Sequence, residues 1–208
     1  MTNKSKIETE IKLPVRDVEN LVATLNELSA RSRGRIFEQN VLYDTPESDL
    51  RRTGWLLRLR KETPSRSKWS DSRRWPGVMT AKMPSKSKSS RYKKRFEREM
   101  MVWEPGRYGR VLRSLGFRPG FRYEKFRTSF QVGVLKVDLD ETPLGTFLEL
   151  EGSGEAINEI ARVLGYSIRD YIRSTYWEIY AADCQRRGVP AKNMVFDRKN
   201  SSKLTLFA

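Results

Sequence analysis

The stretch IETEIKLP, residues 7–14, alternates charged and apolar side chains with a period of two. In an extended chain Glu8, Glu10 and Lys12 share one face, and the isoleucines and Leu13 share the other. This alternation predicts a β-strand with two unlike faces. For a single strand of this kind, the simplest interpretation is that the charged face lies in solvent. Whether that interpretation holds depends on the other strands.

Eight segments have strand-like patterns. The sequence shows no internal repeat and no regular strand–helix–strand alternation. They are 7–13, 35–46, 54–62, 77–83, 94–103, 121–132, 134–141 and 145–152. Amphipathic spacing predicts helices over 18–30, 106–117, 155–166 and 169–187. Eight strands can close into a barrel whose interior holds side chains or one small ligand.

We therefore predict an α+β fold that is mostly β, an eight-stranded antiparallel closed tunnel or barrel with flanking helices. A chain of 208 residues suits a single domain. We place this domain at residues 1–188 and a C-terminal tail at 189–208.

Composition narrows the function classes. The chain has 41 Lys and Arg against 26 Asp and Glu, and its net charge of +15 attracts anions such as nucleic acid, anionic lipid, polyphosphate or a nucleotide. It has no histidine, which excludes Ser-His-Asp or Cys-His catalysis and a histidine-ligated zinc site. The single cysteine, Cys184, excludes an intrachain disulfide. Because there is no apolar leader and no apolar run of about 18 residues, the sequence predicts a soluble, cytoplasmic protein without a membrane partner.

Charge at a period of two recurs on most of the predicted strands. Beyond the first strand it is found at Arg58/Arg60, Arg95/Glu97/Glu99, Lys125/Arg127, Asp138/Asp140 and Glu149/Glu151. Two arrangements fit this pattern. The first is a two-layer β protein whose charged faces are exposed to solvent, and the second is a barrel with the charges inside and its apolar faces packed against helices. Buried charges persist only when they are paired or bound to ions. A lumen with charges of both signs therefore suits an anion bound together with a metal.

The two kinds of charge indicate what that ligand is. Clustered Arg and Lys bind phosphate oxygens, and Arg offers a bidentate fork. Clustered carboxylates bind Mg²⁺ or Mn²⁺, which prefer oxygen ligands and bridge to phosphates. Together they indicate a metal-bound triphosphate.

Several motifs resemble the CYTH superfamily, the triphosphate tunnel metalloenzymes. The hallmark Glu-x-Glu-x-Lys is present as Glu8-Thr9-Glu10-Ile11-Lys12. Further matches follow in the family's order: NVLYDTPESDLRRTGWLLRLRKE (40–62), RFERE (95–99), EKFR (124–127), VDLDETPLGTFLELEG (137–152) and RSTYWEIY (173–180). The resemblance covers most of the chain and implies an eight-stranded antiparallel tunnel with a triphosphate site in its lumen.

The resemblance also implies roles for individual residues. Glu8, Glu10 and Lys12 would form the catalytic part of the site. The divalent metal, Mg²⁺ or Mn²⁺, would be held by Glu8, Glu10, Asp138, Glu149 and Glu151. The phosphate chain would contact Lys12, Arg58, Arg60, Lys82, Arg95, Lys125 and Arg127. Asp140 is given less weight than Asp138, and the match at Lys82 is the least secure because long segments flank it.

Two reactions fit such a site, and the motifs do not separate them. Hydrolysis uses water as the attacking group. Cyclisation uses the ribose 3′-hydroxyl of ATP, as in class IV adenylyl cyclases. We place metal-dependent hydrolysis of inorganic triphosphate or of an organic triphosphate such as thiamine triphosphate or ATP first, and adenylyl cyclase second.

A non-enzymatic module that binds nucleic acid or polyphosphate is a third hypothesis. The net charge and the aromatic residues Trp69, Trp75 and Tyr92 favour it. Alternating carboxylates would repel a nucleic acid, so this partner is not expected. The basic segment 84–94 is predicted to be a solvated loop, with a lid over the tunnel as the alternative.

Two further points concern packing and assembly. The aromatic residues of the last predicted helix have helical spacing and are expected to pack rather than to bind a ligand: Tyr171, Tyr176, Trp177 and Tyr180. The oligomeric state stays open between a monomer and a homodimer.

Overall fold

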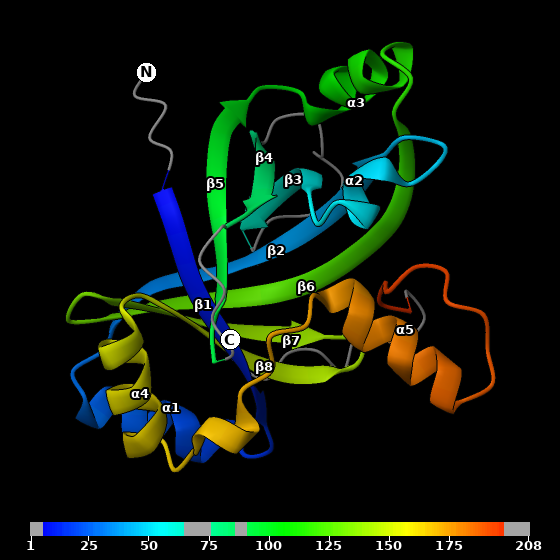
Figure 1. The fold of residues 1–208 in the computed structure, drawn as a ribbon. Helices are drawn as coiled ribbons and strands as arrows, with labels where there is room; N and C mark the ends of the chain where they lie inside the picture. Colours follow the sequence, from blue (N-terminus) through cyan, green and yellow to red (C-terminus); the bar gives the residue numbers. More distant parts are fainter. Residues whose placement is uncertain (1–5, 65–75, 86–90, 198–208) are drawn as a thin grey trace.

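The strands close into one barrel in the order β1-β5-β4-β3-β2-β6-β7-β8, and every neighbouring pair is antiparallel (Figure 1). The computed structural model describes residues 6–64, 76–85 and 91–197. Within these ranges the strands are β1 (Lys6–Val15), β2 (Arg31–Asp44), β3 (Leu56–Pro64), β4 (Gly77–Pro84), β5 (Lys93–Val102), β6 (Arg118–Val132), β7 (Leu135–Thr142) and β8 (Gly145–Glu151). The predicted eight-stranded antiparallel barrel is confirmed.

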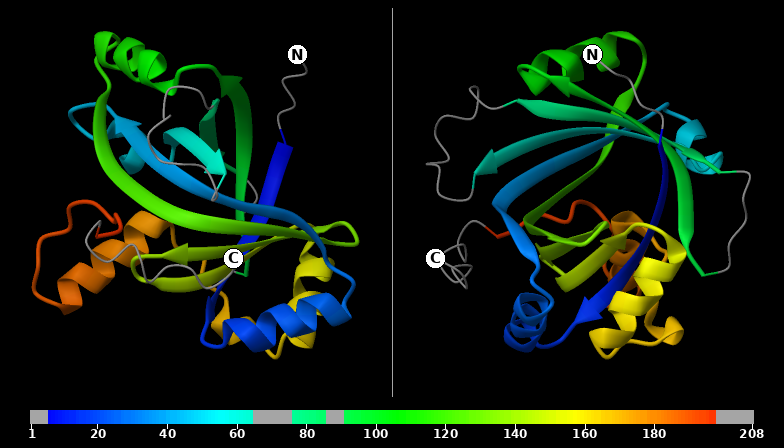
Figure 2. Two further views of the ribbon diagram at one scale, coloured as in Figure 1. Left: turned by 180° about the vertical axis from the view of Figure 1, so that it is seen from behind. Right: turned by 90° about the vertical axis from the view of Figure 1, so that its left-hand side faces the viewer.

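Helices cover the outside of this barrel (Figure 2). The helices α1 (Val18–Glu27) and α4 (Gly154–Val163) lie side by side, while α3 (Pro105–Ser114) connects β5 to β6. Asp17 caps α1, and its carboxylate accepts a 2.9 Å hydrogen bond from the Asn20 N–H. A short helix that the sequence did not predict, α2 (Asp49–Arg52), follows β2.

The predicted helix over 169–187 is wrong in its first third. A 3₁₀ turn at Ile168–Asp170 is followed by non-helical chain, and α5 (Tyr176–Arg186) begins only after Thr175. Thr175 and Glu178 form a capping box that sets this start. In the non-helical stretch Ile172 and Lys12 exchange two backbone hydrogen bonds of 2.9 Å. This pairing ties the beginning of α5 to β1.

Most of the apolar core lies outside the barrel wall, beneath the helices, while the cluster at α5 includes Tyr123 and Tyr176, which line the lumen. The largest cluster joins α1 and α4 to the outer faces of the sheet: Ile11, Leu13, Leu21, Leu25, Phe130, Leu135, Val137, Leu139, Leu148, Leu150, Ile157, Ile160 and Ala161. A second cluster lies at α5, with Phe121, Tyr123, Phe147, Tyr176 and Met194. A third lies at α3, with Tyr43, Leu59, Val102 and Leu112.

The charged side chains of β1 are also buried, on the opposite face. Ile11 and Leu13 are fully buried outside, while Glu8, Glu10 and Lys12 are 7% exposed or less. The interpretation that these charges lie in solvent is therefore wrong. The alternative, a barrel with charges inside and apolar faces against helices, is confirmed.

The described part of the tail returns to the barrel. Met194 pairs with Tyr123 in a parallel bridge and is almost fully buried. Trp69 and Trp75, the centre of the basic segment 84–94 and the chain beyond 197 lie outside the described residues. No helix of the described part of the chain is long and apolar enough to cross a membrane.

Leu148→Ala tests whether the outer cluster stabilises the fold. Leu148 is fully buried under the helices, so we expect the free energy of unfolding to fall by about 2–5 kcal/mol in urea denaturation. Val134→Ala is the control, because Val134 is 87% exposed at the β6–β7 turn. Equal effects of the two substitutions would contradict this placement of the core.

Candidate functional site

The barrel encloses a polar cavity of about 350 Å³. Among the described residues that line it, nine are cationic and six are acidic, so cations are in excess. The cations are Lys12, Arg58, Arg60, Lys82, Lys93, Arg95, Lys125, Arg127 and Lys136, and the acids are Glu8, Glu10, Glu97, Glu99, Glu149 and Glu151. Because strand side chains alternate, charged residues of seven strands, all except β2, reach this one cavity.

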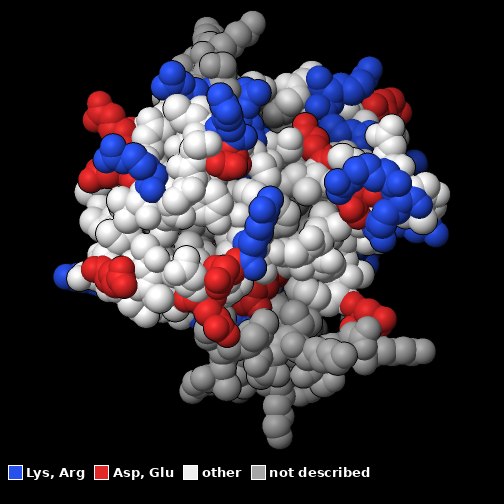
Figure 3. Space-filling view, turned by 90° about the horizontal axis from the view of Figure 1, so that it is seen from below, with Lys and Arg blue, Asp and Glu red and all other residues white. Residues whose placement is uncertain are grey.

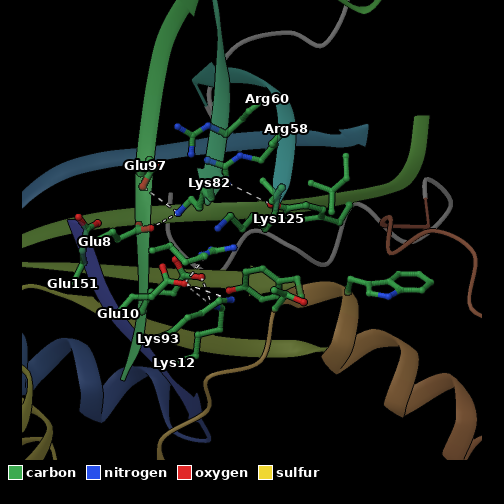
Figure 4. Close-up of a pocket in the computed structure, with 18 of the residues that line it drawn as sticks. Glu8, Glu10, Lys12, Arg58, Arg60, Lys82, Lys93, Glu97, Lys125 and Glu151 are labelled. Atoms are coloured by element: carbon green, nitrogen blue, oxygen red, sulfur yellow. Dashed lines mark hydrogen bonds and ion pairs between the residues drawn. The ribbon is translucent and has the colours of Figure 1, made fainter. Parts of the chain in front are cut away.

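All residues that the sequence predicts to contact phosphate line the cavity. They come from five strands: Lys12, Arg58, Arg60, Lys82, Arg95, Lys125 and Arg127. Lys82, the least secure match, is 5% exposed; it contacts Glu8 and lies 3.1 Å from Glu97 Oε2 (Figure 4).

Two guanidinium groups have buried donors without a partner. The Nε atoms of Arg58 and Arg95 have no hydrogen-bond partner within the described ranges. The terminal nitrogens of Arg58 do have partners, since they donate to Thr80 Oγ1 at 3.1 Å and to Glu99 Oε1 at 3.3 Å. Leaving a buried donor unsatisfied costs about 1–3 kcal/mol. Both side chains line the cavity, so an anion bound there would lie beside these two guanidinium groups.

The carboxylates of β1 are held by cations. Glu10 Oε1 lies 3.4 Å from Arg95, 3.7 Å from Lys93 and 3.9 Å from Lys12. Burial opposes ionisation of Glu10, but the charges of Lys12, Lys82 and Lys93 outweigh it and lower the pKa of this carboxyl well below its ordinary value. Glu10 is therefore ionised at neutral pH.

The predicted metal ligands on β7 and β8 are held in the same way. Glu149 lies 3.3 Å from Lys12 and 2.5 Å from Arg127. Asp138 lies 2.7 Å from Arg127 and does not line the cavity. Glu151 faces the cavity 3.5 Å from Lys136.

Sequence reasoning missed one fully buried carboxylate, Glu38 on β2. It lies 3.4 Å from Arg60, 3.6 Å from Lys125 and 3.7 Å from Arg127. Burial opposes its ionisation, but the nearby cations, Lys125 first, lower the pKa of Glu38 well below its ordinary value. The period-two pair Glu38 and Asn40 was the signal that could have revealed it, because both share the inward face.

The structure also gives Asp140 more contacts than the sequence suggested. Asp140 is fully buried and accepts hydrogen bonds from Lys125 at 2.7 Å and from Arg127 at 2.6 Å. The hydroxyl of Tyr176 donates to the same carboxylate at 2.6 Å. Asp140 therefore orients two of the predicted phosphate-binding cations, while Asp138 holds Arg127 from the other side.

Tyr176 was expected to pack and does so against Phe147 and Tyr123. It also lines the cavity, with the ammonium groups of Lys12 and Lys125 at 5.2 and 5.0 Å from its ring centre. Burial, followed by the charge of Asp140, raises the pKa of its hydroxyl well above the ordinary value. Tyr176 stays neutral, and its hydroxyl donates a hydrogen bond to Asp140.

Two groups at the β4–β5 side titrate near neutral pH. Burial, reinforced by Lys12 and Arg95, lowers the pKa of Lys93 to about 7. Burial, reinforced by the Glu8 carboxylate and only partly offset by Lys82, raises the pKa of Glu97 to about 8. The charge of the lumen therefore falls as the pH rises through this range.

Comparison with known proteins agrees with this geometry. A family model described as the CYTH domain matches residues 6–176. This chain belongs to the CYTH domain family. A relative from Methanocaldococcus jannaschii, named "Putative adenylate cyclase MJ0240", is 27% identical over an alignment 184 residues long, which covers 83% of this chain and 98% of the relative.

Two solved structures share the fold. A putative adenylate cyclase from Vibrio parahaemolyticus is 19% identical, covers 85% of this chain and 98% of its own, and has a TM-score of 0.70. The protein HpAC1 from Hippeastrum, described as a putative adenylyl cyclase with a dominant triphosphatase activity, is 18% identical, covers 88% and 96%, and has a TM-score of 0.53. At these identities the likeness establishes the fold alone.

The CYTH family is in general metal-dependent. Within the described residues of this chain, no group of three metal-ligating side chains is assembled, because the carboxylates are paired with cations. The donor chemistry nevertheless fits a hard cation. Glu10 and Glu151 are register partners on β1 and β8, and Glu149 is two residues away on β8. The lumen thus places carboxylate oxygen donors next to cations.

Glu38→Gln tests the electrostatic account of the lumen. Because the pKa of Glu38 is lowered by folding, its contribution to stability is present above its unfolded pKa and is lost as the pH falls through the acid range. Without this group, the acid slope of the unfolding free energy should decrease by up to about 1.4 kcal/mol per pH unit.

Denaturant titrations of wild type and variant between pH 5 and pH 2 would measure this slope. Glu159→Gln, on the exposed face of α4, is the control and should leave it unchanged. An unchanged slope in Glu38→Gln would contradict the placement of an ionised carboxylate at this position.

Proposed function

We propose that this protein is a divalent-metal-dependent enzyme that processes a triphosphate in the barrel lumen, and that hydrolysis is its main reaction. The observation that carries this proposal is the lining of the cavity, where cations outnumber carboxylates and the charges converge from seven strands. An excess of cations fits a polyanion, and the carboxylates fit the metal bound to it.

The cations have the chemistry for binding the phosphate chain. Arg58 and Arg95 carry the buried unpaired Nε donors, and guanidinium groups bind phosphate oxygens in a bidentate manner. Lys125 and Arg127 are held in place by Asp140, so they lose little further freedom on binding.

The metal, Mg²⁺ or Mn²⁺, would be held by Glu8, Glu10, Glu149 and Glu151, with Asp138 behind Arg127. When bound, the metal would neutralise negative charge on the phosphate oxygens and would lower the pKa of the attacking hydroxyl or water. Lys12 lies between Glu10 and Glu149. We assign it the positioning of both carboxylates and of a phosphate oxygen.

In hydrolysis, the oxygen of water bonds to the terminal phosphorus and the bridging P–O bond breaks. Inorganic triphosphate then yields orthophosphate and diphosphate. The chain's cations stabilise the negative charge that develops on the phosphate oxygens, because they are fixed before the substrate arrives. The Hippeastrum protein, which shares the fold, is described as having dominant triphosphatase activity.

Adenylyl cyclase is the second candidate, and the name of the Methanocaldococcus relative favours it. Here the ribose 3′-hydroxyl attacks the α-phosphorus and pyrophosphate leaves. The same cations and carboxylates would serve, so product identity distinguishes the two reactions.

A nucleic-acid surface is the weakest of the three hypotheses. The carboxylates sit among the cations of the lumen, where they would repel a nucleic acid. On the face of the molecule shown in Figure 3, basic and acidic side chains are interspersed, with broad uncharged areas between them. Neither arrangement forms the basic stripe that backbone binding favours.

Glu8→Gln and Arg58→Ala test the proposal. Glu8→Gln removes a charged metal ligand, so turnover with Mg²⁺ or Mn²⁺ should fall by about 10²-fold or more. Arg58→Ala removes a phosphate contact and should mainly raise KM. The assay measures orthophosphate, pyrophosphate and cyclic AMP from tripolyphosphate, ATP and thiamine triphosphate.

Arg162→Ala, on the outer face of α4, is the control and should keep full activity. Full activity of both lumen variants would contradict the tunnel assignment. Salt-sensitive RNA binding without any turnover would place the binding module first.

A further inference from the structure

Exposed apolar side chains gather at the end of β5 and on α3. Of the twelve large hydrophobic side chains that are exposed in the described part of the chain, five lie between residues 100 and 115. They are Met100, Met101, Trp103, Val111 and Leu115, and their exposed fractions lie between 48% and 69%. Single exposed hydrophobic residues are common, but a group of them marks a contact surface.

The packing of α3 determines which side of the helix is free. Leu112 is buried and joins the cluster of Tyr43 and Leu59. Gly109 faces the same cluster, because a Cβ added there would lie 2.6 Å from the Tyr43 hydroxyl. The opposite side of α3 therefore faces away from the barrel, at the top of the molecule in Figure 1.

The free side of α3 combines apolar and basic side chains. Val111 and Leu115 lie one helical turn apart, and Arg107 lies one turn before Val111. Arg107 is paired with Glu104 at the start of the helix. Its charge is therefore largely neutralised within the protein.

The other arginines of this region keep their charge available. The helix contains three arginines and no acidic residue. Arg110 and Arg113 on α3 and Arg118 at the start of β6 are exposed, and none of them has an acidic partner within the described ranges. The apolar group is therefore flanked by unpaired positive charge.

We propose that this surface docks the protein onto a bilayer that contains anionic lipids. The α3 face, as we call it, consists of Met100, Met101, Trp103, Arg110, Val111, Arg113, Leu115 and Arg118. The inference does not rest on the proposed function, because no residue of the α3 face lines the tunnel cavity.

An anionic bilayer uses both kinds of side chain. Arginines interact with lipid phosphates, while tryptophan and aliphatic side chains enter the boundary between headgroups and acyl chains. A nucleic acid would use the arginines but would leave the aliphatic side chains Val111 and Leu115 in water. A second copy related by a twofold axis would bring arginines against arginines.

A peptide partner fits this part of the molecule less well. Peptides bind in grooves between elements or along open strand edges. The strands close into a barrel, so they offer no open edge among the described residues, and α3 presents the outer side of a helix. The absence of a long apolar run argues against a spanning segment, but a surface contact of this kind needs none.

Flotation of the full-length protein with vesicles tests the charge of the α3 face. Vesicles of phosphatidylcholine with phosphatidylserine should bind more protein than vesicles of phosphatidylcholine alone, and added salt should reduce the difference. The pair Arg110→Gln and Arg113→Gln should lower the partition coefficient onto anionic vesicles by about tenfold or more.

The matched control is the pair Arg162→Gln and Arg169→Gln. It removes the same charge from exposed positions on α4 and in the 3₁₀ turn, and it should keep the partition coefficient within about twofold of wild type. Far-UV circular dichroism establishes that both pairs are folded.

The apolar side chains are tested separately. Leu115→Ser should lower the partition coefficient by about fivefold, whereas Val134→Ser, at an 87% exposed position of the β6–β7 turn, should not change it. Brominated phosphatidylcholine in the anionic vesicles should quench tryptophan fluorescence of the wild type, and this quenching should decrease in Trp103→Phe.

Three results would overturn the inference. The first is equal or absent binding to the two kinds of vesicle, and the second is an equal loss in the α3 pair and the control pair, which would assign the binding to net charge. The third is binding of polyglutamate or RNA through the α3 arginines without binding of vesicles, which would assign the face to a protein or a nucleic acid.

Discussion

The structure depends on one constraint, that charges buried in a barrel must be neutralised where they lie. Arg127 shows how completely this is met, since its guanidinium contacts Asp138, Asp140 and Glu149 within 2.7 Å. An isolated charge in such a place would cost several kcal/mol, about the entire net stability of a domain. The lumen is therefore a network in which each cation holds a carboxylate, and the register of the strands decides which pairs meet.

That constraint explains the rest of the architecture. Since the inner faces of the strands are charged, the apolar faces point outward and need helices to bury them. The α1–α4 pair covers β1, β7 and β8, and α3 covers the cluster of Tyr43 and Leu59. The cluster at α5 differs, because Tyr123 and Tyr176 in it line the lumen. In the lumen, side chains now form ion pairs with one another. When a metal-bound anion enters, these side chains can form ion pairs with the anion and the metal instead. The family's metal dependence is consistent with such an exchange.

Much of this was predictable from period-two alternation, because alternation fixes which residues share a face. It predicted the eight strands and the shared inward face of six cations that line the cavity, while Lys82 was predicted from the family resemblance. Alternation alone could not decide whether the charged face was exposed to solvent or enclosed in a barrel. Closure of the barrel depends on long-range strand pairing, such as that of β1 with β5 and β8. Glu38 and Asp140 were missed or underweighted because their importance comes from neighbours on other strands. The late start of α5 was missed because the Ile172–Lys12 pairing overrides helical spacing.

The most direct test of the central claim is to locate the ligand and the metal in one crystal. Crystals grown with imidotriphosphate and Mn²⁺ would be measured at the manganese edge. The account predicts a phosphate chain inside the barrel in contact with Arg58 and Arg127, and an anomalous peak beside Glu10 and Glu149. A lumen that keeps all its internal ion pairs, with triphosphate or manganese bound only on the outer surface, would contradict it.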